Sequence, residues 1–216
     1  MIKRLETQKA ILNALEEQIR ETGMAGVGVN AIAKRAGVSK ELIYRYFNGM
    51  PGLMMAWMSE QDYWTSHSKH LVEAEFSTRT PADLILSMLR EQIEALGANE
   101  TLREIRRWEL MERNEVTAQL ADRRERAARG FISRVDGLAN GVDVPAHVSI
   151  MLAGVLYLML RSKTESHFLG VELRTNEGWA RIYAALEGIV GQLPTDLKTH
   201  SLAELEAVRE HKDSQA

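Results

Sequence analysis

The stretch from Val29 to Phe47 reads VNAIAKRAGVSKELIYRYF and decides how the N-terminal part of the chain folds. Two short segments with the apolar spacing of helices flank the turn at Gly37. A glycine can take the positive φ that such a turn requires, and Ser39 is a typical N-cap for the second helix. The pattern predicts a helix over about 29–36 and another from Ser39 to about Phe47. Together they form a helix-turn-helix that buries Ile32, Ala33, Val38, Ile43 and Phe47.

The same spacing leaves Lys40, Glu41, Tyr44, Arg45 and Tyr46 on the exposed side of the second helix. A helix fits the major groove of duplex DNA, where polar and basic side chains contact base edges and phosphates. We expect the tyrosine hydroxyls to reach phosphates, and the two cations to reach guanine edges or the backbone. Glu41 could accept a hydrogen bond from a cytosine amino group or simply favour the helix N-terminus. The alternative is an ordinary solvated helix with two core tyrosines.

Residues 5–60 resemble the DNA-binding domain of TetR-type (TetR/AcrR family) transcriptional regulators. The resemblance rests on the pattern Ile-Ala-x-x-Ala-Gly-Val-Ser-x-x-x-Ile-Tyr-x-Tyr-Phe at 32–47, then a short turn and Leu53. It implies a homodimer that binds a pseudo-palindromic double-stranded DNA operator, usually represses, and is released by a small-molecule effector held in a C-terminal helical domain. The DNA contacts expected on this basis are Asn30, Lys34, Ser39, Lys40, Glu41, Tyr44, Arg45 and Tyr46.

Two positions depart from the family pattern. Gly28 stands where such proteins usually place Thr or Ser, which removes a hydroxyl that could reach a phosphate. The turn Asn48-Gly49-Met50 lacks the one or two lysines that usually follow the motif. Phosphate affinity is therefore weaker, or it is supplied by other cations, for which the candidates are Lys3, Arg4, Lys34 and Lys40.

The composition favours an all-α protein without catalytic machinery. The 216 residues contain no cysteine, which excludes disulfides, thiolate-bound metals and a cysteine nucleophile. Aromatic residues make up 6% and there are four prolines, fewer than an all-β chain of this length needs. We find no Walker loop, nucleophile elbow or metal motif, so we expect no enzyme activity and no cofactor. His67, His70 and Glu73 share a predicted helix face, but their surroundings indicate a solvated surface rather than a metal site.

Apolar periodicity predicts further helices along the rest of the chain. They cover about 5–22, 51–76, 81–96, 99–113, 115–139, 145–163 and 177–193, with a weak polar helix at 201–213. Residues 168–173 could be locally extended, but as an isolated segment they are not expected to form a sheet. We therefore predict a three-helix DNA-binding domain at 1–50, a connecting helix from Pro51, an effector-binding and dimerisation domain at 51–200, and a polar tail at 201–216. Residues 1–50 have a net charge of +3 and the remainder −6, which is consistent with a polyanion partner for the N-terminal domain.

The body of the chain suggests where two subunits and an effector would meet. By the family resemblance, helices 145–163 and 177–193 form the dimer interface, and six small residues permit close approach: Ala153, Gly154, Ala180, Ala184, Gly188 and Gly191. Methionine and aromatic side chains favour a pocket for a mostly apolar effector that touches helix 99–113 and the Pro51 helix. The candidate lining residues are Trp64, Trp108, Met111, Tyr157, His167 and Tyr183.

Two further questions are left open by the sequence. Arginines between 103 and 129 could bind an acidic ligand, although the interleaved carboxylates favour a salt-bridged surface. The chain could also be a helical partner-binding module with a degenerate DNA-binding head. We expect a cytoplasmic protein without a membrane segment, because no signal-peptide pattern is present and the apolar stretch at 148–160 is too short to span a bilayer.

Overall fold

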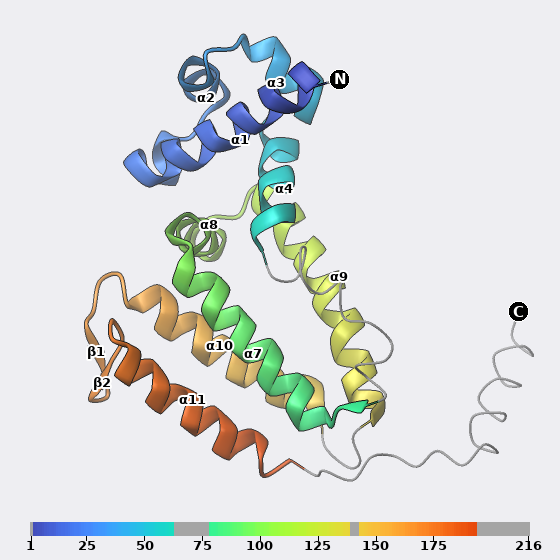
Figure 1. Cartoon of the computed structure of the whole chain (residues 1–216), viewed down its shortest axis with the longest axis vertical. Coiled ribbons are helices and arrows are strands. Elements are labelled where there is room, and N and C mark those ends of the chain that lie inside the picture. Colours follow the sequence, from blue (N-terminus) through green and yellow to red (C-terminus); the bar gives the residue numbers. More distant parts are fainter. Residues whose placement is uncertain (1, 63–77, 139–142, 194–216) are drawn as a thin grey trace, which may run out of the picture.

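The chain is described by a computed structural model that covers residues 2–62, 78–138 and 143–193. The described part is helical apart from one small hairpin, so the predicted all-α class is confirmed (Figure 1). The N-terminal part holds α1 (Ile2–Thr22), the 3₁₀ turn η1 (Met24–Gly26), α2 (Val29–Ala36), α3 (Lys40–Phe47) and α4 (Met50–Gln61). The body holds α7 (Pro81–Ala98), α8 (Glu100–Met111), α9 (Glu115–Leu138), α10 (Val144–Arg161), β1 (His167–Phe168), β2 (Val171–Glu172) and α11 (Asn176–Val190).

Helices α1, α2 and α3 form the head at one end of the molecule (Figure 1). Gly23 ends α1 with φ 66°, and Gly37 closes α2 in the left-handed conformation with φ 65°. The core of the head contains the predicted Ile32, Ala33, Ile43 and Phe47, packed against the apolar stripe of α1, which is Ile11, Leu15 and Ile19. The helix-turn-helix predicted at 29–47 is therefore present with the predicted bounds.

Arg35 fastens α2 to α1 through its guanidinium group. Its Nε donates to Gln18 Oε1 at 3.0 Å, and both terminal nitrogens bond to the carboxylate of Glu21. Glu17 lies 3.6 Å from the same side chain. Arg35 is thus engaged in structural contacts within the head. Its neighbour Lys34, in contrast, is exposed.

Helix α4 joins the head to the body and is shorter than predicted. We expected a helix over 51–76, but α4 ends at Gln61, and Asp62 takes an extended conformation with ψ 130°. The chain leaves the helix there because the buried Asp62 side chain lies 3.4 Å from Nε of Arg124 on α9. Residues 63–77, and with them Trp64, His67 and His70, lie outside the described residues.

Helix α7 is the central helix of the body and contacts α8, α9, α10 and α11. Its buried face includes Leu84, Ile85, Met88 and Leu89. A capping box between Thr80 and Asp83 starts the helix, as the Thr-Pro-Ala-Asp sequence predicts. The five predicted body helices are all present, and their ends lie within three residues of the predicted bounds.

Residues 167–172 form a small antiparallel hairpin, which corrects the expectation that this segment could not make a sheet. His167 pairs with Glu172 and Phe168 with Val171. The segment pairs with itself because Leu169 and Gly170 both adopt positive φ, 49° and 78°, and turn the chain within two residues. The hairpin packs tightly against α11, since a Cβ on Gly178 would overlap the carbonyl group of Glu172.

Helix α10 is long and apolar enough to cross a membrane by length and composition alone. The helix extends to 18 residues, so length no longer excludes a span as it did for the shorter apolar stretch at 148–160. However, α10 contacts α7, α8 and α9, and core helices of soluble proteins pass the same test. The feature is weak evidence for a membrane segment.

The junction of α3 and α4 depends on the absence of a side chain at Gly52. A Cβ there would lie far inside van der Waals contact with the carbonyl oxygen of Phe47. We predict that Gly52→Ala lowers the free energy of unfolding by about 1–3 kcal/mol, as overpacking does, measured by urea denaturation. Gly130→Ala on α9 is the matched control, because its Cβ would meet nothing within 4 Å, and it should stabilise the helix by up to about 1 kcal/mol. Equal effects of the two substitutions would contradict the role assigned to Gly52.

Candidate nucleic-acid interface

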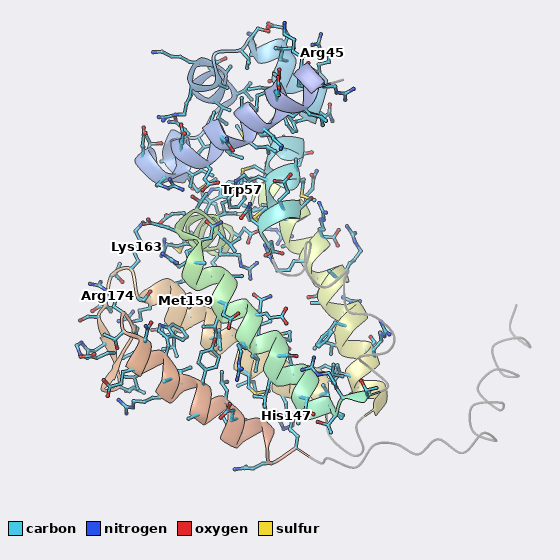
Figure 2. The ribbon with its side chains drawn as sticks, in the orientation of Figure 1. Arg45, Trp57, His147, Met159, Lys163 and Arg174 are labelled. Carbon is cyan, nitrogen blue, oxygen red and sulfur yellow. The ribbon has the colours of Figure 1, made fainter. Side chains whose placement is uncertain are left out.

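Helix α3 presents a polar face away from the body of the molecule, and Arg45 lies at this outer end of the head (Figure 2). Lys40, Glu41, Tyr44 and Arg45 are exposed, and the Tyr44 side chain has 56% exposure. Ile43 and Phe47 point the other way into the core. The spacing of these residues therefore produces the two-sided helix expected from the sequence, with Tyr46 half-buried at its margin.

The first turn of α3 is organised by Ser39 and Glu41. Ser39 occupies the N-cap position, as predicted. Hydrogen bonds from the Glu41 backbone N–H and the Ser39 hydroxyl, with Lys40 nearby, lower the pKa of the Glu41 carboxyl. The Glu41 carboxylate thus has local partners at the start of α3. This is the geometry expected if Glu41 favours the helix N-terminus, the second interpretation given for it above.

Tyr46 lies between two arginines at the end of α3. The guanidinium of Arg4, from the first turn of α1, lies 5.4 Å from the centre of the Tyr46 ring, and that of Arg45 lies 5.0 Å away. Nη2 of Arg45 also donates to the Tyr46 hydroxyl at 3.1 Å. Cations in this arrangement are attracted to the ring face and held in place. The cluster gathers two positive charges and a hydroxyl beside the exposed face of α3.

The remaining predicted contacts lie on α2 and its flanks. Asn30 and Lys34 are exposed on α2, and Ser39 and Lys40 are exposed at the start of α3. Gly28 is the N-cap of α2 and, lacking a side chain, makes no side-chain hydrogen bond there. All eight predicted DNA-contacting residues therefore lie in the head, on or beside the two helices of the motif. Arg4 is the additional cation that tertiary packing brings to them.

A small apolar groove separates the head from the body. It has a volume of about 250 Å³ and is lined by Met24 and Val27 of the head, Met50 and Met54 of α4, Trp108 of α8, and Asn114, Glu115 and Val116 near the start of α9. The Trp108 indole nitrogen donates to Glu112 at 2.8 Å. The groove touches both the Pro51 helix and helix 99–113, the two elements that the effector was expected to contact.

The five described residues of the predicted effector pocket lie in different places. Trp108 lines the head–body groove, Tyr183 lines a separate cavity in the body, and Met111 is 80% exposed at the end of α8. Tyr157 packs edge-on against Phe168 at 5.4 Å. His167 lies on β1, 3.3 Å from Glu172, and Trp64 is outside the described residues. The structure therefore does not bring these residues into one site.

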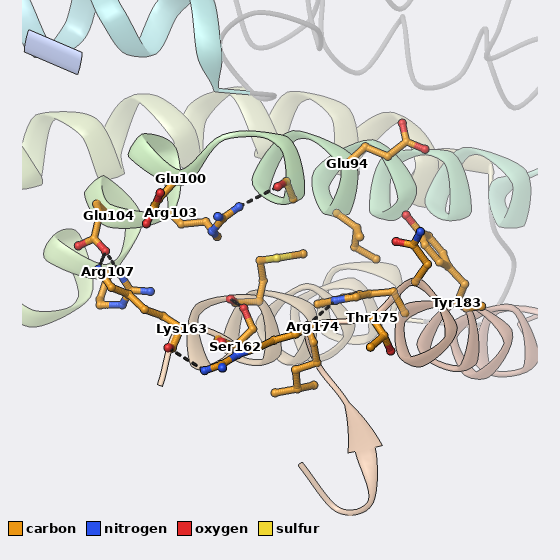
Figure 3. Close-up of a pocket in the computed structure, with 17 residues that line it drawn as sticks. Glu94, Glu100, Arg103, Glu104, Arg107, Ser162, Lys163, Arg174, Thr175 and Tyr183 are labelled. Atoms are coloured by element: carbon orange, nitrogen blue, oxygen red, sulfur yellow. Dashed lines mark hydrogen bonds and ion pairs between the residues drawn. The ribbon is translucent and has the colours of Figure 1, made fainter. Parts of the chain in front are cut away.

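The larger cavity has a volume of about 860 Å³ and lies between α7, α8, α10 and α11 (Figure 3). Of the predicted effector-pocket residues only Tyr183 lines it, although two of the arginines that the sequence suggested for an acidic ligand line it as well. The available signal was the arginine-rich stretch from 103, which includes the lining residues Arg103 and Arg107. Other arginines of that stretch form the expected surface ion pairs, Arg126 with Asp122 and Arg129 with Glu125.

Four charged side chains form a buried ionic cluster behind the head–body groove. Glu109 of α8 lies 3.2 Å from Arg106 and 3.0 Å from Arg124, and Arg124 also pairs with Asp62 at the end of α4. Burial, opposed by Arg106 and reinforced by Asp62, raises the pKa of Glu109 to about 7. The cluster ties the last turn of α4 to α8 and α9. No group of three potential metal ligands occurs among residues 2–62, 78–138 and 143–193.

Comparisons with known proteins give a family match over the head and a shared fold over most of the chain. Residues 11–56 match the family model for bacterial regulatory proteins of the tetR family. No curated protein sequence matches the chain. Similar solved structures include the transcriptional regulator FadR from Bacillus subtilis in complex with stearoyl-CoA, with TM-score 0.64 and 17% identity over 86% of this chain and 99% of that one.

Two further structures have the same fold. The SmeT–triclosan complex has TM-score 0.61 and 21% identity over 83% of this chain and 91% of that one. A putative TetR-family transcriptional regulator from Rhodococcus sp. has TM-score 0.57 and 20% identity over 87% and 98%. At these identities the likeness shows a shared fold that extends well beyond residues 11–56.

The raised pKa of Glu109 predicts a specific pH dependence of stability. Between its ordinary value of 4.5 and about 7 the folded chain binds more protons than the unfolded chain, so this group's contribution falls as pH rises. Glu109→Gln removes this titration. We predict that the free energy of unfolding of the variant minus that of the wild type, measured by urea denaturation, increases by about 2 kcal/mol from pH 5 to pH 8.

Glu125→Gln provides the matched control for this titration. Glu125 is an exposed carboxylate paired with Arg129, and exposed pairs contribute little to stability. The free energy of unfolding of Glu125→Gln minus that of the wild type should change by less than about 0.5 kcal/mol over the same pH range. A similar pH trend in both variants would exclude Glu109 as the source.

Proposed function

We propose that the chain is a member of the tetR family of bacterial regulatory proteins, whose model matches residues 11–56, and that it is a ligand-responsive transcriptional regulator that binds DNA. We propose further that it acts as a repressor, that a homodimer binds a pseudo-palindromic operator, and that a small, mostly apolar effector releases it. Such a protein has no enzymatic step and needs no cofactor. Its place of action is the cytoplasm, where the DNA is.

The observation that carries the proposal is the two-sided α3 helix at the outer end of the head. Its buried side anchors it through Ile43 and Phe47, and its exposed side offers Lys40, Tyr44 and Arg45 to a partner. Hydrogen-bonding and cationic groups on an exposed helix are complementary to base edges and phosphates in a major groove. The other exposed candidates, Asn30 and Lys34, lie on the preceding helix α2 and are suited to the flanking backbone.

The cluster of Arg4, Arg45 and Tyr46 is a candidate phosphate-binding site that can take the place of the lysines which usually follow the motif in the family. The turn after Phe47 has no lysine, whereas the two guanidiniums at Tyr46 provide two cations at the same end of α3. Arginine binds phosphate through paired N–H donors, so the cluster can replace lysines as a backbone contact. Arg4 therefore joins the proposed DNA contacts.

The apolar outer faces of α10 and α11 support a homodimer. Ile150 is 76% exposed, Tyr157 and Ile189 are each 48% exposed, and the small residues between them are also exposed: Ala153, Gly154, Ala180, Ala184 and Gly188. Faces of this kind are covered by another protein surface when helices of two subunits pack together. In a two-fold dimer the two α3 helices would read half-sites about 34–36 Å apart, one turn of DNA, or a multiple of this distance.

The head–body groove is the proposed effector site. Its walls come from the head, from α4 and from α8. A ligand that fits the groove in only one position of the head would therefore shift the equilibrium toward that position. A complete switch from 99% to 1% DNA-competent protein needs about 5.5 kcal/mol of differential binding. The methionines and Trp108 favour an apolar or aromatic effector with one polar group. Ligand complexes of similar structures, with stearoyl-CoA and with triclosan, support a ligand-responsive body.

Removing polar groups from α3 tests DNA binding. Lys40→Ala combined with Tyr44→Phe should weaken binding to an operator selected by the wild-type chain from random duplexes by about 30-fold or more, since two lost contacts at about 1–3 kcal/mol each remove at least about 2 kcal/mol. Phenylalanine keeps the ring, which packs near Gly49, and removes only the hydroxyl. Fluorescence anisotropy measures the affinity, and sedimentation checks the oligomeric state.

Arg126→Ala serves as the control for this test, because it removes one positive charge from an exposed pair on α9. It should bind the operator within about twofold of wild type, as expected for a charge far from the DNA. A wild-type chain that selects no duplex at all would instead favour a partner-binding module with a degenerate head.

Narrowing the groove tests the effector site. Apolar, aromatic and highly charged metabolites are first screened for operator release. For an apolar compound that releases the wild type, Val116→Phe should reduce the response about tenfold or more, because the added ring occupies the groove, while operator affinity without the compound is retained. Val171→Phe on the hairpin, outside the groove, should respond normally. Release only by highly charged compounds would refute the apolar site.

A further inference from the structure

The 860 Å³ cavity between α7, α8, α10 and α11 has two chemically different ends (Figure 3). Arg107 and Lys163 lie at one end, and Glu94 and Tyr183 lie at the other. We propose that this cavity is a second ligand site, distinct from the head–body groove, which binds an organic anion with an aromatic or short aliphatic body. The proposal concerns the body alone and holds whether or not the head binds DNA.

The cationic end carries more positive than negative charge. Arg103, Arg107, Lys163 and Arg174 contribute four positive charges there, opposed by Glu100 and Glu104. Glu104 is shared, because both Arg107 and Lys163 pair with it. Although burial alone would raise its pKa, the bond from Lys163 and the neighbouring Arg107 lower the pKa of Glu104, so it stays ionised. One carboxylate between two cations leaves net positive charge for an incoming anion.

Two of these cations are held in place by backbone carbonyls rather than by carboxylates. Nη1 of Arg103 donates to the carbonyls of Leu96 and Gly97 at the end of α7. Arg174 donates to the carbonyls of Ser162 and Lys163 just after α10, at 2.7 and 3.0 Å. Within the described part of the chain, neither arginine has a carboxylate at ion-pair distance. Both side chains are therefore fixed at the cavity wall with their charge not neutralised.

Each anchored guanidinium also keeps N–H groups for a ligand. A guanidinium has five N–H donors, and these bonds engage only one nitrogen of Arg103 and two of Arg174. The remaining donors can bind an anionic oxygen without displacing the structural bonds. Donors positioned in advance lose little entropy on binding, which increases affinity.

The wall of the cavity also has an apolar and aromatic part, made of the buried side chains of Ile93, Met159 and Leu173 and the rings of Trp179 and Tyr183. Tyr183 lies at the end opposite Arg107 and Lys163. The Trp179 indole nitrogen donates to the Leu173 carbonyl at 2.9 Å, which fixes the plane of that ring. Glu94 carries a negative charge at this end, so it disfavours an anion there. A ligand with one anionic end would therefore bind in a single orientation.

The size and charge of the cavity together restrict the ligand class. A volume of 860 Å³ suits an organic molecule and is far larger than one inorganic anion requires. A wholly apolar ligand would cover charged groups of the cationic end without pairing them, which is unfavourable. A carboxylate, sulfonate or phosphate attached to a ring or a short chain satisfies both ends.

Two fluorescent probes that differ by one charge test the proposal. The first is 8-anilino-1-naphthalenesulfonate, and the second is N-phenyl-1-naphthylamine, which has the same rings without the sulfonate. Titrating the full chain, without DNA, should show one sulfonate probe per chain, bound at least tenfold more tightly than the amine. Because no operator is present, the outcome is independent of whether the head binds DNA.

Variants of the cavity locate the probe. Arg103→Gln with Arg174→Gln keeps an amide donor for each carbonyl and should weaken the sulfonate at least tenfold while leaving the amine within twofold. Gly97→Trp, at a lining position where an added Cβ would meet nothing within 4 Å, fills the cavity and should weaken both probes at least fivefold. Circular dichroism and Tm confirm that each variant is folded.

Arg126→Gln with Arg129→Gln is the charge-matched control on the exposed face of α9, and it should bind both probes like wild type. Three results would overturn the proposal. They are equal affinity for the two probes, an equal loss of sulfonate binding in the α9 control, and unchanged binding when Gly97 is replaced by Trp.

Discussion

Helix α4 is buried on several sides at once, and the arrangement of head and body depends on this burial. Leu53, Met54, Trp57 and Met58 are all almost completely inaccessible to solvent. Each such side chain contributes about 1.5–3 kcal/mol relative to exposure. The Trp57 indole nitrogen lies 3.4 Å from Glu16 of α1, while α4 also contacts α3 and α9. One short helix thus lies within the single hydrophobic core that runs from the head into the body, and movement of the head or the body must be accommodated at α4.

Helix α8 borders the large cavity, the head–body groove and the buried ionic cluster. One side carries Arg103, Glu104 and Arg107 towards the large cavity, and Trp108 lines the groove against the head. Glu109 belongs to the buried ionic cluster, which extends through Arg124 to Asp62, the residue that follows α4. The helix also contacts α1 and the η1 turn directly. A ligand that displaces α8 from either side would therefore act on the same contacts between head and body.

The arginines of this protein differ in what they are free to do, and their partners decide it. Arg35 is fully engaged with Gln18 and Glu21, so it stabilises the head. Arg4 and Arg45 face a neutral ring and keep their charge available to an anion. Arg103 and Arg174 are anchored by carbonyl groups, which hold the side chain without neutralising it. Counting charges along the sequence does not separate these three situations.

The sequence by itself determined the helix-turn-helix, because the signals involved are local. The apolar spacing around Ile32, Ile43 and Phe47, the turn at Gly37 and the cap at Ser39 act within a few residues of one another. The exposed face of α3 follows from the same periodicity. The bounds of α7 to α11 were also predictable, since each helix carries its own apolar stripe and most begin with a recognisable cap.

Only the tertiary structure decided where distant residues meet. Arg4 reaches Tyr46 across 42 positions of sequence, and Arg107 donates to the carbonyl of Leu160, 53 residues away. The end of α4 at Gln61 depends on Arg124 from α9, a partner that no local pattern reveals. Five of the predicted pocket residues are described by the structure, and the packing of helices places them apart, with Trp108 at the groove and Tyr183 at the cavity. Periodicity specifies which face of a helix is buried, whereas side-chain packing between helices decides which cavities remain.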